Sequence, residues 1–190
     1  MTKKLVYGIG VDDINVGRKW KDQCPFYDRW RGMLRRCYSE KTLVKYPTYR
    51  GCSVCEEWLT FSNFKSWMET QDWEGKHLDK DLLINGNKVY SPDTCIFVDK
   101  LVNRFTTERT HDRGEYPLGV TKIERLKDNP YAAQCSNPFT GKRGHIGVYK
   151  TPEEAHLAWK RRKHELACML AESEYVDDPR LAEALKTRYV

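Results

Sequence analysis

The sequence predicts an α+β protein, and three observations lead to this fold class. Residues 77–105 contain two short apolar runs on either side of an Asn-Gly turn, followed by helical spacing. Residues 117–150 contain three strand-like runs separated by turn residues, and a long helical pattern comes next. Residues 25–69 carry apolar side chains at intervals of three and four, which is typical of amphipathic helices.

The composition is that of a globular chain with a basic balance. Its 190 residues are 39% hydrophobic and 32% charged, and the formal net charge of +6 is compatible with a polyanionic partner. No apolar run approaches the ~20 residues that a membrane-spanning helix needs. The chain has seven cysteines, and its start lacks the long apolar segment of a secretory signal. We therefore expect reduced thiols, no membrane partner and a cytoplasmic location.

Two amphipathic helices are predicted in the first half of the chain, one beginning near Pro25 and one near Ser62. The face of the first helix opposite its apolar side is basic, and two interpretations of it stay open: a solvated surface and a contact with phosphate. The first helix has Tyr27, Trp30, Met33, Leu34, Cys37 and Tyr38 on its apolar face and Arg31, Arg35 and Arg36 on its basic face, and the second has Phe61, Phe64, Trp67 and Met68 on its apolar face.

Residues 77–105 are predicted to form a hairpin followed by a helix. Asp79 lies in the first apolar run, the turn is centred on Gly86, and the second run begins at Cys95. Asp99 can cap a helix that carries Asn103. Such a unit can bring Asp79 and Asn103 together, and their hard oxygen atoms suit Mg²⁺ or a similar divalent cation.

Residues 24–105 resemble the ββα-metal module of phage-type HNH endonucleases. The matching words, in order, are RCY, YPxYxG, VCxEW, FxNF, LDKD and SPxTC, with a late Asn. The resemblance implies Asp79 and Asn103 as metal ligands and gives Thr94 the place of the family's middle Asn. It also puts Lys80 where the family has its general-base His. His77 is the nearest histidine, although on a strand it faces the side opposite to Lys80. Lys80, by its position, and His77, by its residue type, are the two catalytic candidates.

The cysteines allow a second metal prediction. Cys52 and Cys55 have the spacing of zinc ligands, and Cys37, Cys95 or Cys24 can complete a tetrahedral set. The alternative is that these are ordinary buried thiols, because Cys37 lies on an apolar helix face and Cys95 lies in an apolar strand.

The second region is predicted to be a three-stranded antiparallel sheet packed on one helix. The expected strands are residues 118–125, 131–136 and 143–149. A helix should begin after Thr151, which is followed by proline and an acidic first turn, and it should run to about Ala171. A helix on one side of the sheet leaves the other side for a partner.

Residues 117–172 resemble the APETALA2-type DNA-binding domain, which reads the major groove with the free face of its sheet. The words that match are LGV, PYAAQ, GHIGVY and TPEEAHLAW. Leu118, Thr121 and Ile123 stand where the family commonly has basic residues, so a weaker or different DNA-sequence preference is expected for this chain. By position, the resemblance implies that DNA is contacted by Thr121, Arg125, Gln134, Ser136, Arg143 and His145.

These observations predict four segments: an HNH-like module with helical elaboration over residues 1–105, a linker over 106–116, a DNA-binding domain over 117–172 and a tail over 173–190. The expected function is metal-dependent hydrolysis of phosphodiesters by a double-stranded-DNA endonuclease or nickase, in the host cytoplasm if a phage encodes it. The alternative is a catalytically decayed scaffold that still binds DNA. An unrelated protein-interaction module has no feature of the sequence in its favour, and the oligomeric state stays open.

Overall fold

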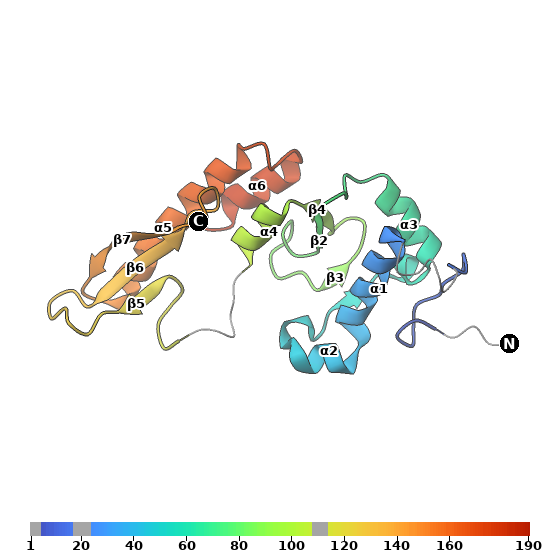
Figure 1. Ribbon diagram of the computed structural model, residues 1–190, viewed down its shortest axis with the longest axis horizontal. Helices are drawn as coiled ribbons and strands as arrows, with labels where there is room; N and C mark the ends of the chain where they lie inside the picture. The colour runs from blue at the N-terminus through green and yellow to red at the C-terminus, as the bar shows by residue number, and fades with distance from the viewer. Residues whose placement is uncertain (1–4, 17–23, 108–113) are drawn as a thin grey trace. The chain divides into compact units, whose positions relative to one another are not determined.

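The computed structural model describes residues 5–16, 24–107 and 114–190. The chain divides into two compact units, Met1–Val98 and Asp99–Val190, and each is described by itself (Figure 1). Both contain helices and strands, so the predicted α+β class is confirmed. The predicted linker lies largely outside the described residues, because residues 108–113 are not among them.

The first unit begins with helices packed around aromatic side chains. Both predicted helices are confirmed, since α1 forms over Pro25–Tyr38 and α3 over Phe61–Glu69. Trp30 on α1 is fully buried and its Nε1 donates a hydrogen bond to the carbonyl oxygen of Trp58 at 2.7 Å. Between these two helices lie α2 (Glu40–Lys45), the short 3₁₀ helices η1 (Pro47–Tyr49) and η2 (Glu56–Leu59), and strand β1 (Ser53–Val54).

The strands of the first unit form two small ladders. Strand β2 (His77–Asp79) pairs antiparallel with β4 (Ile96–Val98), and Asp79 lies opposite Ile96. Strand β3 (Val89–Tyr90) instead pairs in parallel with β1. The predicted hairpin is therefore confirmed at its base. The chain between its strands turns away to support a second ladder.

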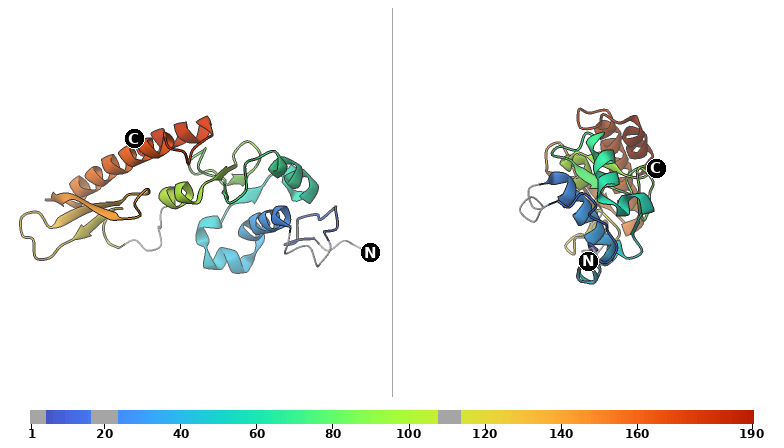
Figure 2. Two further views of the ribbon diagram at one scale, coloured as in Figure 1. Left: turned by 45° about the horizontal axis from the view of Figure 1, so that its top comes forward. Right: turned by 90° about the vertical axis from the view of Figure 1, so that its right-hand side faces the viewer.

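The second unit contains the predicted three-stranded sheet, in the order β5-β6-β7 with both pairs antiparallel (Figures 1 and 2). Helix α5 packs against these strands, and its N-terminus has a complete capping box between Thr151 and Glu154. The elements are α4 (Lys100–Thr106), β5 (Val120–Lys122), β6 (Tyr131–Ser136), β7 (Arg143–Tyr149), α5 (Pro152–Ala171) and α6 (Pro179–Thr187).

Contact between Gly119 and Trp159 sets how closely the helix approaches the sheet. Gly119 has a φ of +78°, and a Cβ atom there would lie 2.0 Å from Cδ1 of Trp159. His156 bonds the carbonyl oxygen of Leu118 through Nδ1 at 2.9 Å and stacks on Trp159. Two of the matching sequence motifs, LGV and TPEEAHLAW, thus pack against each other in the structure.

Helix α4 and the C-terminal segment belong to this second unit. Phe105 of α4 packs edge-on against Tyr189, and Leu181 and Leu185 of α6 are buried. The sequence prediction placed α4 with the N-terminal module and treated residues 173–190 as a tail. The difference arises because Phe105 finds its packing partner 84 positions later, at Tyr189, a contact that no local pattern reveals.

Candidate functional site

The free face of the three-stranded sheet gathers most of the side chains predicted to contact DNA. On β6, Gln134 lies opposite His145 and Ser136 lies opposite Arg143. Ala132 precedes Gln134 by two positions on the same face, and its partner on β5 is Thr121. The sheet therefore aligns Thr121, Gln134, Ser136, Arg143 and His145 on one side, with Gln134 partly buried and the other four exposed.

A β-bulge in the pairing of β6 with β7 accompanies this arrangement of side chains on the free face. The register shifts between Ala133 and Gln134, so that Ala133 pairs with Gly147 while Gln134 pairs with His145. Ile146 is the additional residue of β7, and such a bulge re-aims the side chains beyond it. Ala133 and Cys135 point to the opposite side and are buried where α5 packs. The face under α5 is therefore small and apolar, whereas the free face carries the polar and basic side chains together with Ala132 and the exposed Val148.

Arg125 does not share the regular geometry of this face. Strand β5 ends at Lys122, whereas the sequence prediction extended it to residue 125. The backbone amide of Ile123 bonds the carbonyl of Pro130 at 2.7 Å, and the chain then turns. Arg125 is exposed on this turn. The strand-based reason for placing Arg125 beside Thr121 and Ile123 is therefore wrong, although Arg125 stays accessible at the edge of the sheet.

In the first unit, Asp79 closes a tight turn at the end of β2. Its Oδ1 accepts hydrogen bonds from the backbone amides of Asp81 and Leu82, at 2.9 and 2.8 Å. Burial raises the pKa of the Asp79 carboxyl, and the nearby negative charge of Asp81 raises it further. Asp79 is therefore held by the backbone of the turn that follows β2, and its carboxyl lies beside a second carboxylate, that of Asp81.

Lys80 is buried, only 6% exposed, and bound as a cation. Its Nζ donates to Oδ2 of Asp81 at 2.8 Å and to the carbonyl oxygen of Asn87 at 3.0 Å, and it lies 5.9 Å from the ring centre of Tyr90. Burial lowers the pKa of Lys80, but the bond and the charge of Asp81 outweigh it, so that the net shift is upward. A general base needs the opposite direction.

The loop between β2 and β4 is held by hydrogen bonds from side chains to backbone carbonyls, which the sequence patterns did not predict. Asn87 donates through Nδ2 to the carbonyl oxygens of Lys80 and Val89, at 2.6 and 2.7 Å. Thr94 donates to the same Val89 carbonyl at 2.8 Å. The Asn-Gly-Asn sequence was a signal for a turn, but not for this cross-loop bonding.

The remaining candidates of the metal and catalytic set are divided between the units. His77 lies on β2 opposite Val98, in the first unit. Asn103 lies on α4 in the second unit, where its backbone amide bonds the carbonyl of Asp99 at 2.9 Å and Asp99 Oδ1 caps the helix. The sharing of one ion by Asp79 and Asn103 stays a prediction, because the two residues belong to different units.

The four candidate zinc ligands lie in or beside one apolar core. Cys37, Cys52 and Cys95 are buried there, and Cys55 is half-buried against it. Burial raises the pKa of Cys37 and of Cys95 to about 12, and it also raises the pKa of Cys55. Among the described residues, no group of three or more His, Cys, Asp or Glu side chains is arranged to hold a metal ion.

Comparison with protein-family models, with curated proteins and with solved structures finds no match to this chain. Within the described ranges, none of the helices has the length and apolar character needed to cross a membrane.

Proposed function

We propose that this chain is a double-stranded-DNA-binding protein that contacts the duplex through the free face of its three-stranded sheet. The observation that carries the proposal is the in-register pairing of Gln134 with His145 and of Ser136 with Arg143 on the exposed face. Arginine and glutamine can form paired hydrogen bonds to base edges, and serine and threonine can bond phosphate oxygens. The opposite face is occupied by α5, so the polar face is where a partner would dock.

We further propose that residues 77–105 provide the metal site of an HNH-like, metal-dependent endonuclease or nickase that acts on the bound DNA. Asp79 and Asn103 would hold the ion, Mg²⁺ or another divalent cation, with phosphate oxygens and water completing its shell. Such an ion stabilises negative charge on the cleaved phosphodiester and its leaving oxygen. His77 and Lys80 are the candidates to position water or phosphate. Burial and the charge of Asp81 raise the pKa of the Asp79 carboxyl, and a bound cation would stabilise its ionised form.

The second candidate is a decayed nuclease that binds DNA without cleaving it, and the geometry of Lys80 favours it over an active enzyme with Lys80 as base. The ammonium group is bound by Asp81 and Asn87, and its pKa is raised. Lys80 then has the role of holding the loop. An active enzyme on this scaffold would need a base elsewhere, and His77 on β2 is the nearest histidine in sequence.

A plasmid-nicking assay distinguishes the two candidates. Supercoiled DNA is incubated with the full chain and Mg²⁺ or Mn²⁺, with and without chelator, beside Asp79→Asn and His77→Ala variants. Chelator-sensitive nicking that is lost in Asp79→Asn supports the nuclease. Nicking that survives in Asp79→Asn would contradict the assigned site. Binding without nicking supports the decayed scaffold.

Lys80 is tested in the same assay by Lys80→Met, which keeps the apolar stem but removes the cation. If Lys80 is base or phosphate clamp, Lys80→Met abolishes nicking while DNA affinity and folding stay near wild type. If it holds the loop, the free energy of unfolding falls by about 1–3 kcal/mol, because Asp81 and the Asn87 carbonyl lose their donor. Denaturant unfolding followed by circular dichroism measures this loss.

A further inference from the structure

Arg36 differs from the other arginines of the basic face of α1. Arg31 pairs with Asp28 at the surface, with 3.7 Å between Nη2 and Oδ1, and Arg35 is exposed. Arg36 is instead half-buried near the C-terminal end of α1, beside the buried Cys37. The two interpretations of this basic face therefore separate by residue, with Arg31 and Arg35 solvated and Arg36 turned toward the protein.

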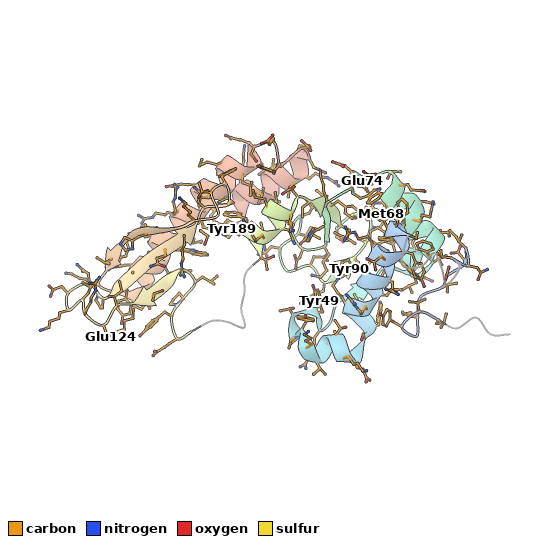
Figure 3. The ribbon with its side chains drawn as sticks, viewed as in Figure 1. Tyr49, Met68, Glu74, Tyr90, Glu124 and Tyr189 are labelled. Carbon is orange, nitrogen blue, oxygen red and sulfur yellow. The ribbon has the colours of Figure 1, made fainter. Side chains whose placement is uncertain are left out.

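Two tyrosines flank the Arg36 guanidinium. Its Cζ lies 5.4 Å from the ring centre of Tyr90 and 6.0 Å from that of Tyr49, and both rings are labelled in Figure 3. Tyr90 is 3% exposed and fixed by β3, whose carbonyl at Tyr90 accepts from the amide of Cys55 at 2.9 Å. Tyr49 is fixed by η1, where its amide bonds the carbonyl of Tyr46. Rigid elements therefore hold both rings in place around the cation.

The charge of Arg36 is not balanced by a carboxylate within residues 5–16, 24–107 and 114–190. Its Nε is buried and has no hydrogen-bond partner there. Lys80, whose Nζ lies 5.9 Å from the centre of the same Tyr90 ring, is by contrast paired with Asp81. Burial opposes the charge of Arg36, but Tyr90 and Tyr49 outweigh that cost, so that the pKa of Arg36 is raised and the group is a cation without a carboxylate counter-ion in the described part of the chain. An anion beside the guanidinium would supply that counter-ion.

We propose that Arg36, flanked by Tyr49 and Tyr90, is an anion site that takes a phosphate group, and that in the bound state this is a backbone phosphate of DNA. A guanidinium presents its donors in a fork that matches two phosphate oxygens. The site lies in the same unit as Asp79, and Tyr90 contacts both Arg36 and the lysine that follows Asp79. The identification of the phosphate with DNA rests on the proposed function. The anion site itself does not.

The variants that test this site are Arg36→Met and the matched control Arg35→Met. Arg35 is the neighbouring residue and is exposed, so the control removes the same charge from outside the proposed site. DNA affinity of the full chain is measured by fluorescence anisotropy at several salt concentrations. Arg36→Met is expected to weaken binding about tenfold and to lower the slope of log K against log salt by ~0.9, the value of one phosphate contact. Arg35→Met is expected to match wild type. Equal effects of the two variants would overturn the DNA part of the proposal.

Inorganic phosphate tests the anion site without DNA. Thermal unfolding is compared in sodium phosphate and in sodium chloride of equal ionic strength. Wild type and Arg35→Met should melt higher in phosphate, and Arg36→Met should not. The same phosphate gain in all three proteins overturns the site. Absence of DNA binding by wild type would instead refute the proposed function, and the phosphate comparison would still decide on Arg36.

If Arg36→Met does not fold, wild type alone decides. The Nε–H signal of Arg36 is followed by NMR during titration with inorganic phosphate and then with a short duplex. A shift in both titrations supports the site and its DNA ligand. A shift with free phosphate alone supports an anion site that does not serve DNA. A signal unmoved by either refutes the proposal.

Discussion

The ammonium group of Lys163 caps the end of α4, donating to the carbonyl oxygen of Phe105 at 2.6 Å while lying 3.5 Å from the centre of the Phe105 ring. It also lies 5.4 Å from the ring centre of Tyr189. A cation at a helix C-terminus meets the negative end of the helix dipole, and an aromatic face adds to that attraction. One side chain of α5 thus ties α4 and the C-terminal segment into a single unit.

Replacing Lys163 should loosen this tie. We expect Lys163→Met to lower the free energy of unfolding by about 1–3 kcal/mol, because the Phe105 carbonyl loses its donor and both rings lose their cation. Arg161→Met is the control, since Arg161 is an exposed cation on the same helix. Denaturant unfolding of the full chain measures the difference. Equal stabilities of the two variants would mean that the contact contributes no net free energy.

Asp79 gives a pH-dependent prediction. Its pKa is raised, so the folded state binds the proton more tightly than the unfolded state, and the stability from this group falls as pH rises from about 3.9 through the folded value. Asn can still accept the amide bonds of Asp81 and Leu82 through its side-chain oxygen. Asp79→Asn should therefore become more stable relative to wild type as pH rises across that window.

Urea unfolding at pH 4 to 8 without divalent cations tests the Asp79 prediction, with Asp93→Asn as the control for loss of an exposed carboxylate in the same unit. An advantage of Asp79→Asn that does not change with pH would contradict it. Repeating the series with Mg²⁺ reports on the metal, because an ion held by Asp79 would stabilise wild type and not the variant.

Thiol reactivity separates buried cysteines from a zinc site. At pH 8 the thiols of Cys37 and Cys95, with pKa values of about 12, are almost entirely protonated and shielded, so iodoacetamide should modify them last. The half-buried Cys24, Cys55 and Cys168 should react first. Mass spectrometry of partly alkylated protein gives the order. Protection of Cys55 together with Cys37, Cys52 and Cys95, with release of zinc on thiol modification, would establish the zinc alternative.

Regular local patterns were enough to predict most of the fold. Apolar spacing located α1 and α3, and the Thr151-Pro152 signal located the start of α5. What local patterns could not provide are contacts between distant residues. Phe105 packs on Tyr189, and Lys163 of α5 donates a hydrogen bond to the carbonyl oxygen of Phe105 on α4. These contacts decide to which unit α4 belongs.

For the candidate site, alternation along strands predicted the sheet face but not its details. The bulge at Ile146 leaves Gln134 and His145 paired, and the glycine that follows it, Gly147, is the only local indication of a bulge in this part of β7. At the end of β2, the resemblance singled out Asp79 and Lys80 but not their bonding, because the partners Asp81 and Asn87 lie in the loop that follows. Arg36 was one of several arginines, and only its burial between tyrosines distinguishes it.

The sheet face makes the most direct prediction for DNA. Arg143 is exposed opposite Ser136 on the side away from α5, so Arg143→Ala should remove a DNA contact without opening the core. If its fork reads a guanine, affinity for the preferred duplex falls by about 1–3 kcal/mol and discrimination relaxes at one position. If it meets a phosphate, all sequences lose affinity alike and the salt slope falls by ~1.

Fluorescence anisotropy with the full chain, over several duplexes and salt concentrations, distinguishes these two outcomes for Arg143. Arg161→Ala is the matched control, because it removes the same charge from α5, whose packed side covers the other face of the sheet. Loss of affinity in Arg143→Ala but not in Arg161→Ala would support binding by the free face. Equal losses would mean that net charge, and not this face, carries the attraction. Unchanged DNA affinity in Arg143→Ala would contradict the prediction that Arg143 on the free face contacts DNA.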